Sequence, residues 1–288
     1  MYIYFVDFEA IRRLVIVSIF SDDQLLERLV LKGGNAISLV YGFGSRTSLD
    51  IDCSLDGDFD IVEEASARLE RALQRRFAET GCRVFDFRFE KRPSQDRADA
   101  PESWGGYTAS FKIINVSQSE SVKNDLEGMR RNSLKIGPAQ ERVFAIDMSK
   151  HEYCVPKREK EMQDFTIYVY SPAMISLEKL RAICQQMDEY SVQRNRSPRA
   201  RDFYDIHAVL TGSGVDWAGN DNLELAKHIF AAKNVPPKLI SLIPNYREFH
   251  RQDWAAVEQA VSEKLRTYDF YFDFVLEESG KLKAFGEP

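Results

Sequence analysis

Apolar residues recur at two different spacings along the chain, and the two spacings occupy different halves. In the first half, short alternating or wholly apolar runs are typical of β-strands. We predict strands over 82–90, 107–116, 142–148 and 165–170. A helical spacing marks residues 59–78, which Gly81 terminates. The first half is therefore predicted to contain both strands and helices. The polar segment 117–141 is left unassigned.

Residues 7–30 are predicted to form two helical pieces, separated at the capping run Ser21-Asp22-Asp23. From Ser171 onward the periodicity is helical, beginning with a serine cap and a proline at the first helical position. Further helices are predicted over 172–187, 202–210, 222–233, 253–266 and 268–283. The pattern predicts an α+β protein, with a sheet-containing core at 1–170 and a mostly helical domain at 171–288.

Composition narrows the function without naming it. The 288 residues suffice for one large domain or two smaller ones. The net charge of −6 is not that of a general nucleic-acid binder, so any contact with nucleic acid must come from a local patch. The cysteines are scattered, which argues against a zinc site or disulfide framework and favours a reducing, cytoplasmic location. The start lacks a basic signal-peptide region, and no apolar run is long enough to span a membrane.

The stretch from Leu31 to Cys53 carries the first chemical signal. Gly33 and Gly34 precede a short predicted helix at 35–41, a place where a backbone can approach phosphate closely. Asp50 and Asp52 follow on a predicted strand, and residues two apart on a strand share a face. Paired carboxylates repel unless a cation neutralises them, and hard divalent cations prefer such oxygen ligands. Each feature alone is common, but their order favours phosphoryl or nucleotidyl transfer.

Three later residues are candidate partners of this stretch. Asp147 ends an apolar strand, either as a strand-end carboxylate or as a third metal-facing one, whereas Asp86 shares a polar face with charged neighbours. Lys179 lies on an apolar helix face, where it either extends outward or serves a site. Asp202 lies on the packing side of the next helix, so it either caps that helix, pairs with an arginine or meets Lys179.

Four segments in this order resemble the AbiEii/AbiGii toxin family, a branch of the nucleotidyltransferase superfamily found in toxin–antitoxin and abortive-infection systems. The match covers about residues 30–210. The matching segments are Leu31-Lys-Gly-Gly-Asn-Ala, Arg46-Thr-Ser-Leu-Asp-Ile-Asp, Glu178-Lys-Leu-Arg-Ala and Arg201-Asp-Phe-Tyr-Asp-Ile.

The resemblance implies a mixed-sheet nucleotidyltransferase core followed by a helical region that completes the cleft. It implies metal-dependent transfer of a nucleoside monophosphate from NTP, with Mg²⁺, or alternatively Mn²⁺, as the cofactor. Some members modify the acceptor end of tRNA, and a toxin of this kind would have a cognate antitoxin protein. The metal carboxylates fall on Asp50, Asp52 and Asp147, and the other catalytic positions on Ser48, Lys179 and Asp202. The NTP-binding positions fall on Lys32, Gly33, Gly34, Asn35 and Arg46.

The wider superfamily has Gly-Ser where this chain has Gly34-Asn35, which changes the expected phosphate contact. A basic loop holding Arg194, Arg196 and Arg199 is either a solvated charge run or a guide for an RNA backbone. Other acceptors stay open at this stage, namely a protein, a small molecule or the chain itself. A non-catalytic member that binds nucleotide or a partner is the remaining alternative.

Overall fold

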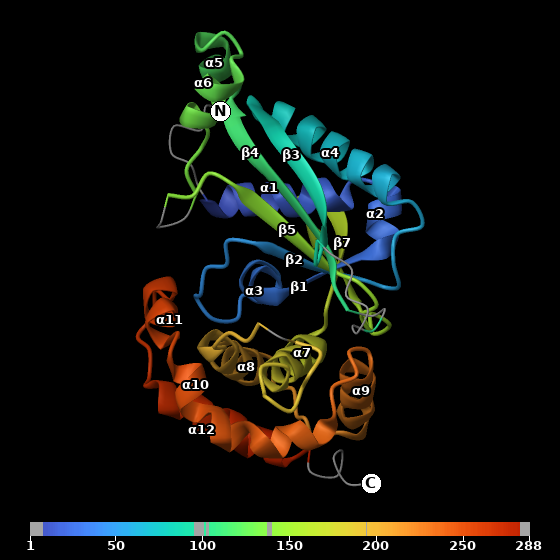
Figure 1. Ribbon diagram of the computed structural model, residues 1–288, viewed down its shortest axis with the longest axis vertical. Helices are drawn as coiled ribbons and strands as arrows, with labels where there is room; N and C mark the ends of the chain where they lie inside the picture. The colour runs from blue at the N-terminus through green and yellow to red at the C-terminus, as the bar shows by residue number, and fades with distance from the viewer. Residues whose placement is uncertain (1–7, 95–100, 102–103, 137–139, 194, 283–288) are drawn as a thin grey trace.

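The structure is a computed structural model that describes residues 8–94, 101, 104–136, 140–193 and 195–282. A mixed sheet and its covering helices form one part of the molecule, and a group of helices lies beneath it (Figure 1). The strands are β1 (Leu29–Lys32), β2 (Ile51–Leu55), β3 (Cys82–Arg92), β4 (Gly106–Asn115), β5 (Phe144–Ser149), β6 (Arg158–Met162) and β7 (Phe165–Val169). They form a seven-stranded sheet in the order β3-β4-β5-β2-β1-β7-β6.

The helices of the first half are α1 (Phe8–Phe20), α2 (Asp23–Arg28), α3 (Gly33–Asn35), the π-helical turn η1 (Ala36–Tyr41), α4 (Val62–Ala78), α5 (Val116–Ser121) and α6 (Leu126–Asn132). The helices of the second half are α7 (Pro172–Cys184), α8 (Ala200–Ser213), α9 (Asn220–Ala231), the 3₁₀ helix η2 (Pro237–Tyr246), α10 (Arg247–Arg251), α11 (Trp254–Ala260) and α12 (Tyr268–Gly280). This is the predicted α+β class, although the division into separate domains at residue 170 stays a prediction.

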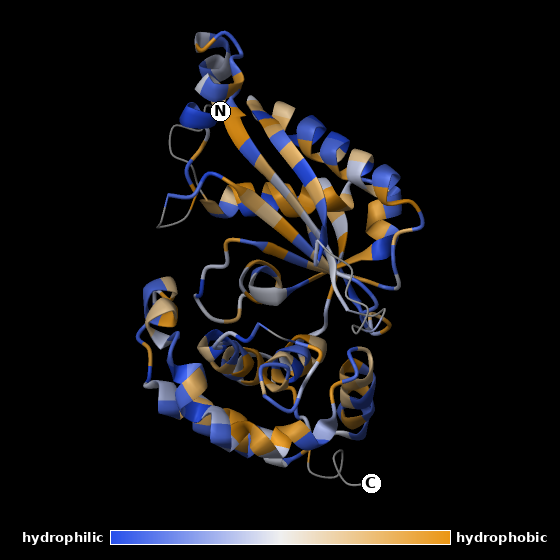
Figure 2. Cartoon of the chain, in the orientation of Figure 1, coloured by the Kyte–Doolittle hydropathy of each residue, from blue (hydrophilic) through white to orange (hydrophobic). Residues whose placement is uncertain are grey.

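The sheet combines parallel and antiparallel pairs. β2 runs parallel to β5 and β1 parallel to β7, whereas the other neighbouring pairs are antiparallel. Helices α1 and α4 pack against each other and against the sheet. The helical prediction for 59–78 is confirmed by α4, whose inward residues are apolar while its solvent side is hydrophilic (Figure 2). The sheet is thereby covered on the side away from the second group of helices.

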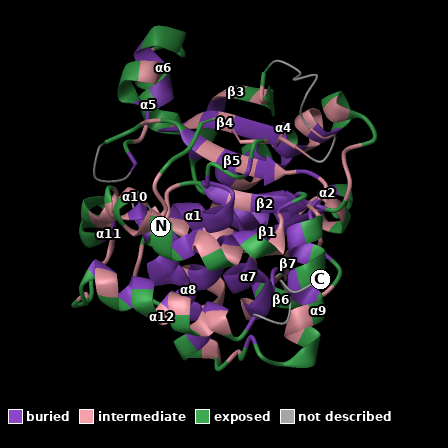
Figure 3. Cartoon of the chain, turned by 60° about the horizontal axis from the view of Figure 1, so that its bottom comes forward, coloured by how far each residue is buried: buried purple, intermediate pink, exposed green. Residues whose placement is uncertain are grey.

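Helix α7 is the centre of the second half. It begins at the predicted Ser171 cap, whose side chain accepts a hydrogen bond from the Met174 backbone nitrogen. It packs against α8, α9 and η2, so that every residue except Pro172 and Glu178 is buried (Figure 3). Buried charges need partners, so we expect the two buried cations of α7, Lys179 and Arg181, to pair with polar groups nearby.

The prediction that the second helical piece continues through Leu29 and Val30 into the glycine pair was wrong, although its first part is confirmed by α2, which ends at Arg28. Leu29, Val30 and Leu31 form a strand between β2 and β7, and all are buried. A short run that is apolar on both faces is compatible with a buried helix end and with a central strand, so its spacing does not separate the two. Pairing with two neighbouring strands decides in favour of the strand.

The prediction that Phe85, Phe87 and Phe89 share one face of a strand was also wrong. The pairing of β3 with β4 shifts register between Phe85 and Arg88, and Asp86 has a φ of 55°. Phe85 packs in a small cluster with Ile114 and Met129, while Phe87 and Phe89 contact the main core. A β-bulge inserts an extra residue and thereby reverses the alternation that follows it.

Candidate active site

A row of polar side chains crosses four neighbouring strands of the sheet. In register, Lys32 of β1 lies opposite Asp52 of β2, Asp52 lies beside Asp147 of β5, and Asp147 lies opposite Thr108 of β4. The Thr108 hydroxyl donates a hydrogen bond of 2.5 Å to Asp147 Oδ1. The strands thus bring together two carboxylates that are 95 residues apart in the sequence and fix one of them by a side-chain hydrogen bond.

Asp50 lies one residue before β2 begins and is exposed, whereas Asp52 is partly buried within the strand. Burial raises the pKa of Asp52 to about 6, against the opposing effect of Lys32 and Lys179. Burial, followed by the charge of Asp147, also raises the pKa of Asp50. The charge of Asp147 therefore acts on both Asp50 and Asp52, which differ in exposure.

These carboxylates supply hard oxygen ligands of the kind that magnesium and manganese prefer. Among the described residues, no group of three His, Cys, Asp or Glu side chains is already arranged to hold a metal ion. Burial is the main cause of the raised pKa of Asp52, to which the charge of Asp147 adds, and a divalent cation would stabilise the ionised carboxylate. The residues present fit a metal held by a carboxylate pair with further oxygens from a ligand, rather than a preformed protein cage.

Gly33 and Gly34 lie so close to neighbouring side chains that a residue with a Cβ would clash at either position. Gly33 has a φ of 69°, and a Cβ there would lie 2.2 Å from Asp52 Oδ2. A Cβ on Gly34 would lie 2.8 Å from the Arg46 guanidinium and 2.8 Å from Ser48 Cβ. The glycine pair therefore packs directly against the Asp52 carboxylate and against the loop that carries Arg46 and Ser48.

Asn35 is fully buried and both ends of its side-chain amide are hydrogen-bonded within the protein. Its Oδ1 accepts a bond of 3.0 Å from Arg12, and its Nδ2 donates a bond of 2.6 Å to the Asp50 backbone carbonyl. Arg12 also donates a bond of 3.3 Å to the Ser48 carbonyl. In this arrangement Asn35 braces the backbone that carries the acidic residues, which differs from the phosphate contact expected for it.

Lys179 and Asp202 meet, as one of the sequence alternatives proposed. Lys179 Nζ lies 2.9 Å from Asp202 and 2.7 Å from Asp205, and all three residues are buried. Burial would lower the pKa of Lys179, but the two carboxylates raise it overall. Arg46 forms a two-pronged pair with Asp205, at 2.9 Å and 2.7 Å. The network joins the loop before β2 to helices α7 and α8.

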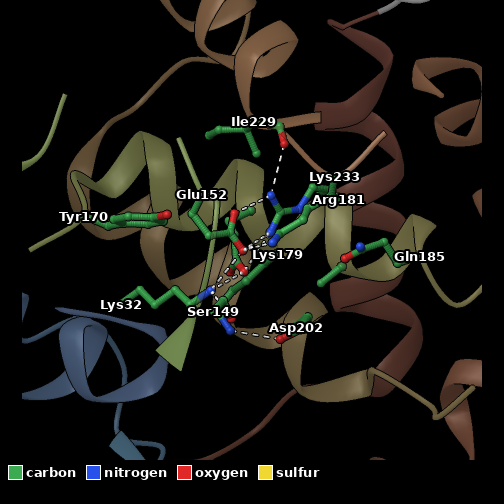
Figure 4. A network of polar contacts seen from close by, with 12 residues as sticks. Lys32, Ser149, Glu152, Tyr170, Lys179, Arg181, Gln185, Asp202, Ile229 and Lys233 are labelled. Atoms are coloured by element: carbon green, nitrogen blue, oxygen red, sulfur yellow. Dashed lines mark hydrogen bonds and ion pairs between the residues drawn. The ribbon is translucent and has the colours of Figure 1, made fainter. Parts of the chain in front are cut away.

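A second buried network surrounds Lys32 (Figure 4). Lys32 Nζ lies 3.1 Å from Glu178 and 3.5 Å from Glu152, while Arg181 contacts Glu152 at 2.8 Å and Glu178 at 3.2 Å. Burial would lower the pKa of Lys32, but Glu178 and Glu152 raise it above its usual range. Lys32, expected to bind NTP, is thus held between the sheet and α7 by two glutamates.

An open cleft of about 610 Å³ separates the sheet from α7. Among the predicted catalytic and NTP-binding residues, Asp147 lines this cleft, whereas Asp52, Lys179 and Asp202 lie behind its walls. The lining also includes Arg92, Pro93, Trp104, Gly105, Gly106, Tyr107, Thr108, Ala145, Met148, Ser149, Glu152, Glu178, Arg181, Ala182, Gln185, Gln193, Arg199 and Lys233. The charged residues of the lining comprise three carboxylates and four cations: Asp147, Glu152, Glu178, Arg92, Arg181, Arg199 and Lys233.

The basic loop is only partly directed at the cleft. Arg199 lines it and lies 2.8 Å from Asp202, whereas exposed Arg196 pairs with Asp188. Arg194 lies outside the described residues. Glu152, Thr108 and Lys233 could not be singled out from the sequence, because each lies in a segment without a local motif. Only the sheet register and the packing of α7 bring them to the site.

The chain matches the profile of the nucleotidyl transferase AbiEii toxin family of type IV toxin–antitoxin systems over residues 15–278. The chain belongs to this family. It is therefore a nucleotidyltransferase of the AbiEii toxin class, and the resemblance seen in four sequence segments is confirmed over nearly the whole chain. Among its described residues, no helix has the length and apolar character needed to cross a membrane.

Solved structures to which this chain is similar include JHP933 from Helicobacter pylori, with 18% identity, a TM-score of 0.49, and coverage of 97% of this chain and 92% of that one. A second Helicobacter pylori protein, described as a candidate nucleotidyltransferase, gives 16% identity, a TM-score of 0.49, and coverage of 97% and 95%. An antigenic nucleotidyltransferase-like protein from Paracoccidioides brasiliensis gives 13% identity, a TM-score of 0.41, and coverage of 88% and 94%. A search of curated proteins finds no match.

Proposed function

We propose that this AbiEii-family chain transfers a nucleoside monophosphate from an NTP to the end of an RNA, such as the acceptor end of tRNA, in a metal-dependent reaction in the cytoplasm. The observation that carries the proposal is the register of Asp52 beside Asp147 on parallel strands, with Asp147 lining an open cleft. Asp52 and Asp147 would hold the divalent cation, and Asp50 would join them. When bound, that cation would neutralise charge on the phosphates.

The chain's own residues supply the remaining parts of the reaction. Asp147 would accept the proton of the attacking acceptor hydroxyl, while Thr108 holds its other oxygen. The acceptor oxygen would bond to the α-phosphorus as the bond to the β-phosphate oxygen breaks, so pyrophosphate leaves. Gly33 and Gly34 would let the backbone lie close to the phosphates, with Ser48 beside them.

Lys179 would act on the triphosphate, because a compact ammonium suits a phosphate contact. Asp202 and Asp205 hold that ammonium in the structure, and Arg46 holds Asp205 in turn. Lys179 also acts electrostatically on Asp52, so the helical half and the carboxylate strand influence each other. Lys32 and Asn35 would position the glycine pair and the strand, rather than bind phosphate directly.

Two features support an RNA acceptor and a partner protein. Arg92 and Arg199 line the cleft, where guanidinium groups would contact an RNA backbone without reading its sequence. The family belongs to type IV toxin–antitoxin systems, which supports an antitoxin as the natural partner. We propose that the chain acts as the toxin of such a pair by disabling RNA needed for translation.

Incubating the protein with each α-labelled NTP, magnesium and total tRNA tests this proposal. We expect label from one or more NTPs on RNA, and removal of magnesium with a chelator should abolish it. Mass spectrometry of the labelled product would identify the acceptor. Label on protein or on a small molecule would contradict the RNA assignment, and tight NTP binding without pyrophosphate release would contradict catalysis.

A further inference from the structure

Trp104 is an aromatic side chain of the cleft wall that the proposed chemistry does not use; the other aromatic there, Tyr107, is buried, and its hydroxyl donates a hydrogen bond of 2.7 Å to Asp58. Trp104 lines the cleft and is partly exposed, at the turn where the β3–β4 hairpin approaches the active-site edge of the sheet. The molecule's other tryptophans lie elsewhere: Trp217 is fully buried, and Trp254 packs against Tyr268 and Tyr271. Trp104 alone among the tryptophans borders the cleft.

Backbone hydrogen bonds form at Trp104 and at the residue that follows it. Its nitrogen donates a hydrogen bond of 2.8 Å to the Pro101 carbonyl, and the next carbonyl, of Gly105, accepts a bond of 3.3 Å from Lys150. Gly105 has a φ of 96°, and a Cβ there would lie 2.2 Å from the Arg92 carbonyl. These two hydrogen bonds and the close packing of Gly105 constrain the described backbone at and after Trp104, which lines the cleft.

Trp104 lies a few residues before the part of β4 that pairs with the strand of Asp147. Gly106 pairs with Ser149 and Thr108 with Asp147, so the hairpin leads from Trp104 along the strand to the carboxylate edge. Four residues of extended chain span at most about 13 Å, at about 3.3 Å per residue. A nucleotide whose phosphate lies near Asp147 would therefore reach toward the indole with its base. Arg92 and Arg199 line the same cleft, where they would lie near the negatively charged phosphates of the nucleotide.

We propose that Trp104 is the platform of a nucleobase subsite, on which a base stacks while its phosphate lies at the Asp147 end of the cleft. The proposal rests on the proposed nucleotidyl transfer. Aromatic stacking accepts any base, and arginines beside it follow the phosphate backbone, which is the combination used to bind unpaired nucleotides. The base belongs either to the incoming NTP or to the end of the RNA acceptor.

Tryptophan fluorescence and binding measurements on the full chain test the subsite. The protein would be titrated, with magnesium present, first with ATP, GTP, CTP and UTP separately, and then with a short single-stranded RNA. We expect saturable quenching in the wild type and in Trp254→Phe, and its loss in Trp104→Phe. Quenching by an NTP assigns the base to the incoming nucleotide, and quenching by RNA alone assigns it to the acceptor.

Calorimetry then measures affinity without relying on fluorescence. Trp104→Ala should weaken binding of the quenching ligand by about 5- to 150-fold, the range that corresponds to roughly 1–3 kcal/mol for one stacked base. Trp104→Phe, which keeps an aromatic face, should stay within about threefold of the wild type. Circular dichroism and thermal unfolding of the variants would verify that they fold.

Equal affinity of the wild type and Trp104→Ala for both ligands would overturn the subsite, as would the absence of saturable binding of either ligand to the wild type. The labelling assay separates this failure from failure of the proposed function. Label transfer with unchanged binding in Trp104→Ala overturns the subsite alone. Weakened binding in Trp104→Ala without any label transfer overturns the proposed reaction and leaves the nucleobase subsite in place.

Discussion

At the residue scale, the Asp52 carboxylate is costly to ionise because it is buried, and in its ionised form it can bind a cation. Burial raises its pKa to about 6, above the ordinary value of 3.8. The folded state therefore holds the proton more tightly than the unfolded state, and stability falls as pH rises through this window. At neutral pH the carboxylate is ionised at a cost, partly offset by Lys32 and Lys179. A cation bound beside it would offset the remaining cost of ionisation. For this reason the buried carboxylate fits a metal site.

The glycine that borders Asp52 provides a residue-scale prediction. Gly33→Ala and Gly42→Ala both introduce a side chain at a φ near 70°, which costs about 1–2 kcal/mol in either case. Only at Gly33 does the new Cβ meet a neighbour, at 2.2 Å from Asp52 Oδ2, whereas Gly42 has nothing within 4 Å. We expect both variants to be destabilised in urea unfolding, but only Gly33→Ala to lose NTP-dependent label transfer. Equal loss of activity in both would contradict the role of this close approach.

At the element scale, the loop before β2 is joined to helices α7 and α8 by charge. Arg46, Asp205 and Lys179 come from these three elements and contact one another away from solvent. Helical spacing was enough to place Lys179 and Asp202 on inward faces, so their contact could be anticipated. The part played by Asp205 could not, because its partner Arg46 is 159 residues away and reaches it only through the folded loop.

Loss of Arg46 tests the energetic weight of this connection. Arg46→Ala leaves Asp205 buried with one cation fewer, and breaking a buried pair in this way should cost about 3 kcal/mol. Arg28→Ala removes an arginine from the exposed pair with Asp60 and should change stability by less than about 1 kcal/mol. Urea unfolding of both variants gives the comparison. Similar stabilities for the two variants would show that the Arg46 pair contributes no more than a surface contact.

Helix α8, which carries Asp202 and Asp205, also has an acid-sensitive contact at its start. His250 of α10 is fully buried, and its Nδ1 accepts a hydrogen bond of 3.2 Å from the Arg199 backbone nitrogen. Burial lowers the pKa of His250 to about 4, below its ordinary 6.5. The unfolded state therefore binds a proton first, and stability present at neutral pH is lost as pH falls from about 6.5 to 4.

Unfolding free energies across this pH range check the effect. The difference between wild type and His250→Gln should shrink by at most about 3 kcal/mol between pH 7 and 4, because the variant has no imidazole to protonate. His228→Gln, which changes an exposed histidine stacked on Tyr153, should follow the wild-type profile. Parallel pH profiles for wild type and His250→Gln would contradict the assignment.

Some elements could be predicted from the local pattern of apolar and polar residues, and others could not. Helix α4 and the start of α7 were predictable because a one-sided apolar pattern and a Ser-Pro cap are local signals. Strand β1 was not, because its residues are buried on both faces. Strand β6 was missed because all but Met162 of its residues are exposed and charged, which is usual for a sheet edge but lacks an apolar face.

At the scale of the whole molecule, the site combines the polar row on strands β1, β2, β5 and β4 with the first helices of the second half. The sequence contained both sets of residues, and the order of motifs was enough to predict nucleotidyl transfer and the AbiEii family. It was not enough to predict the cleft, whose walls combine β4, β5 and α7 with Lys233 after α9. Those contacts depend on packing between segments more than one hundred residues apart, such as those of Gly106 and Lys233, and local spacing carries no information on this packing.

The central claim is that Asp52 and Asp147, joined by strand register, carry out the transfer together. Its most direct test is the initial rate of label transfer from NTP to RNA by Asp52→Asn and Asp147→Asn. Asp86→Asn is the control, since Asp86 pairs with Lys112 and Arg130 away from the cleft. We predict a loss of at least about 100-fold in each of the two site variants and near wild-type rates in the control. Wild-type rates in Asp52→Asn or Asp147→Asn, in folded protein, would contradict the account.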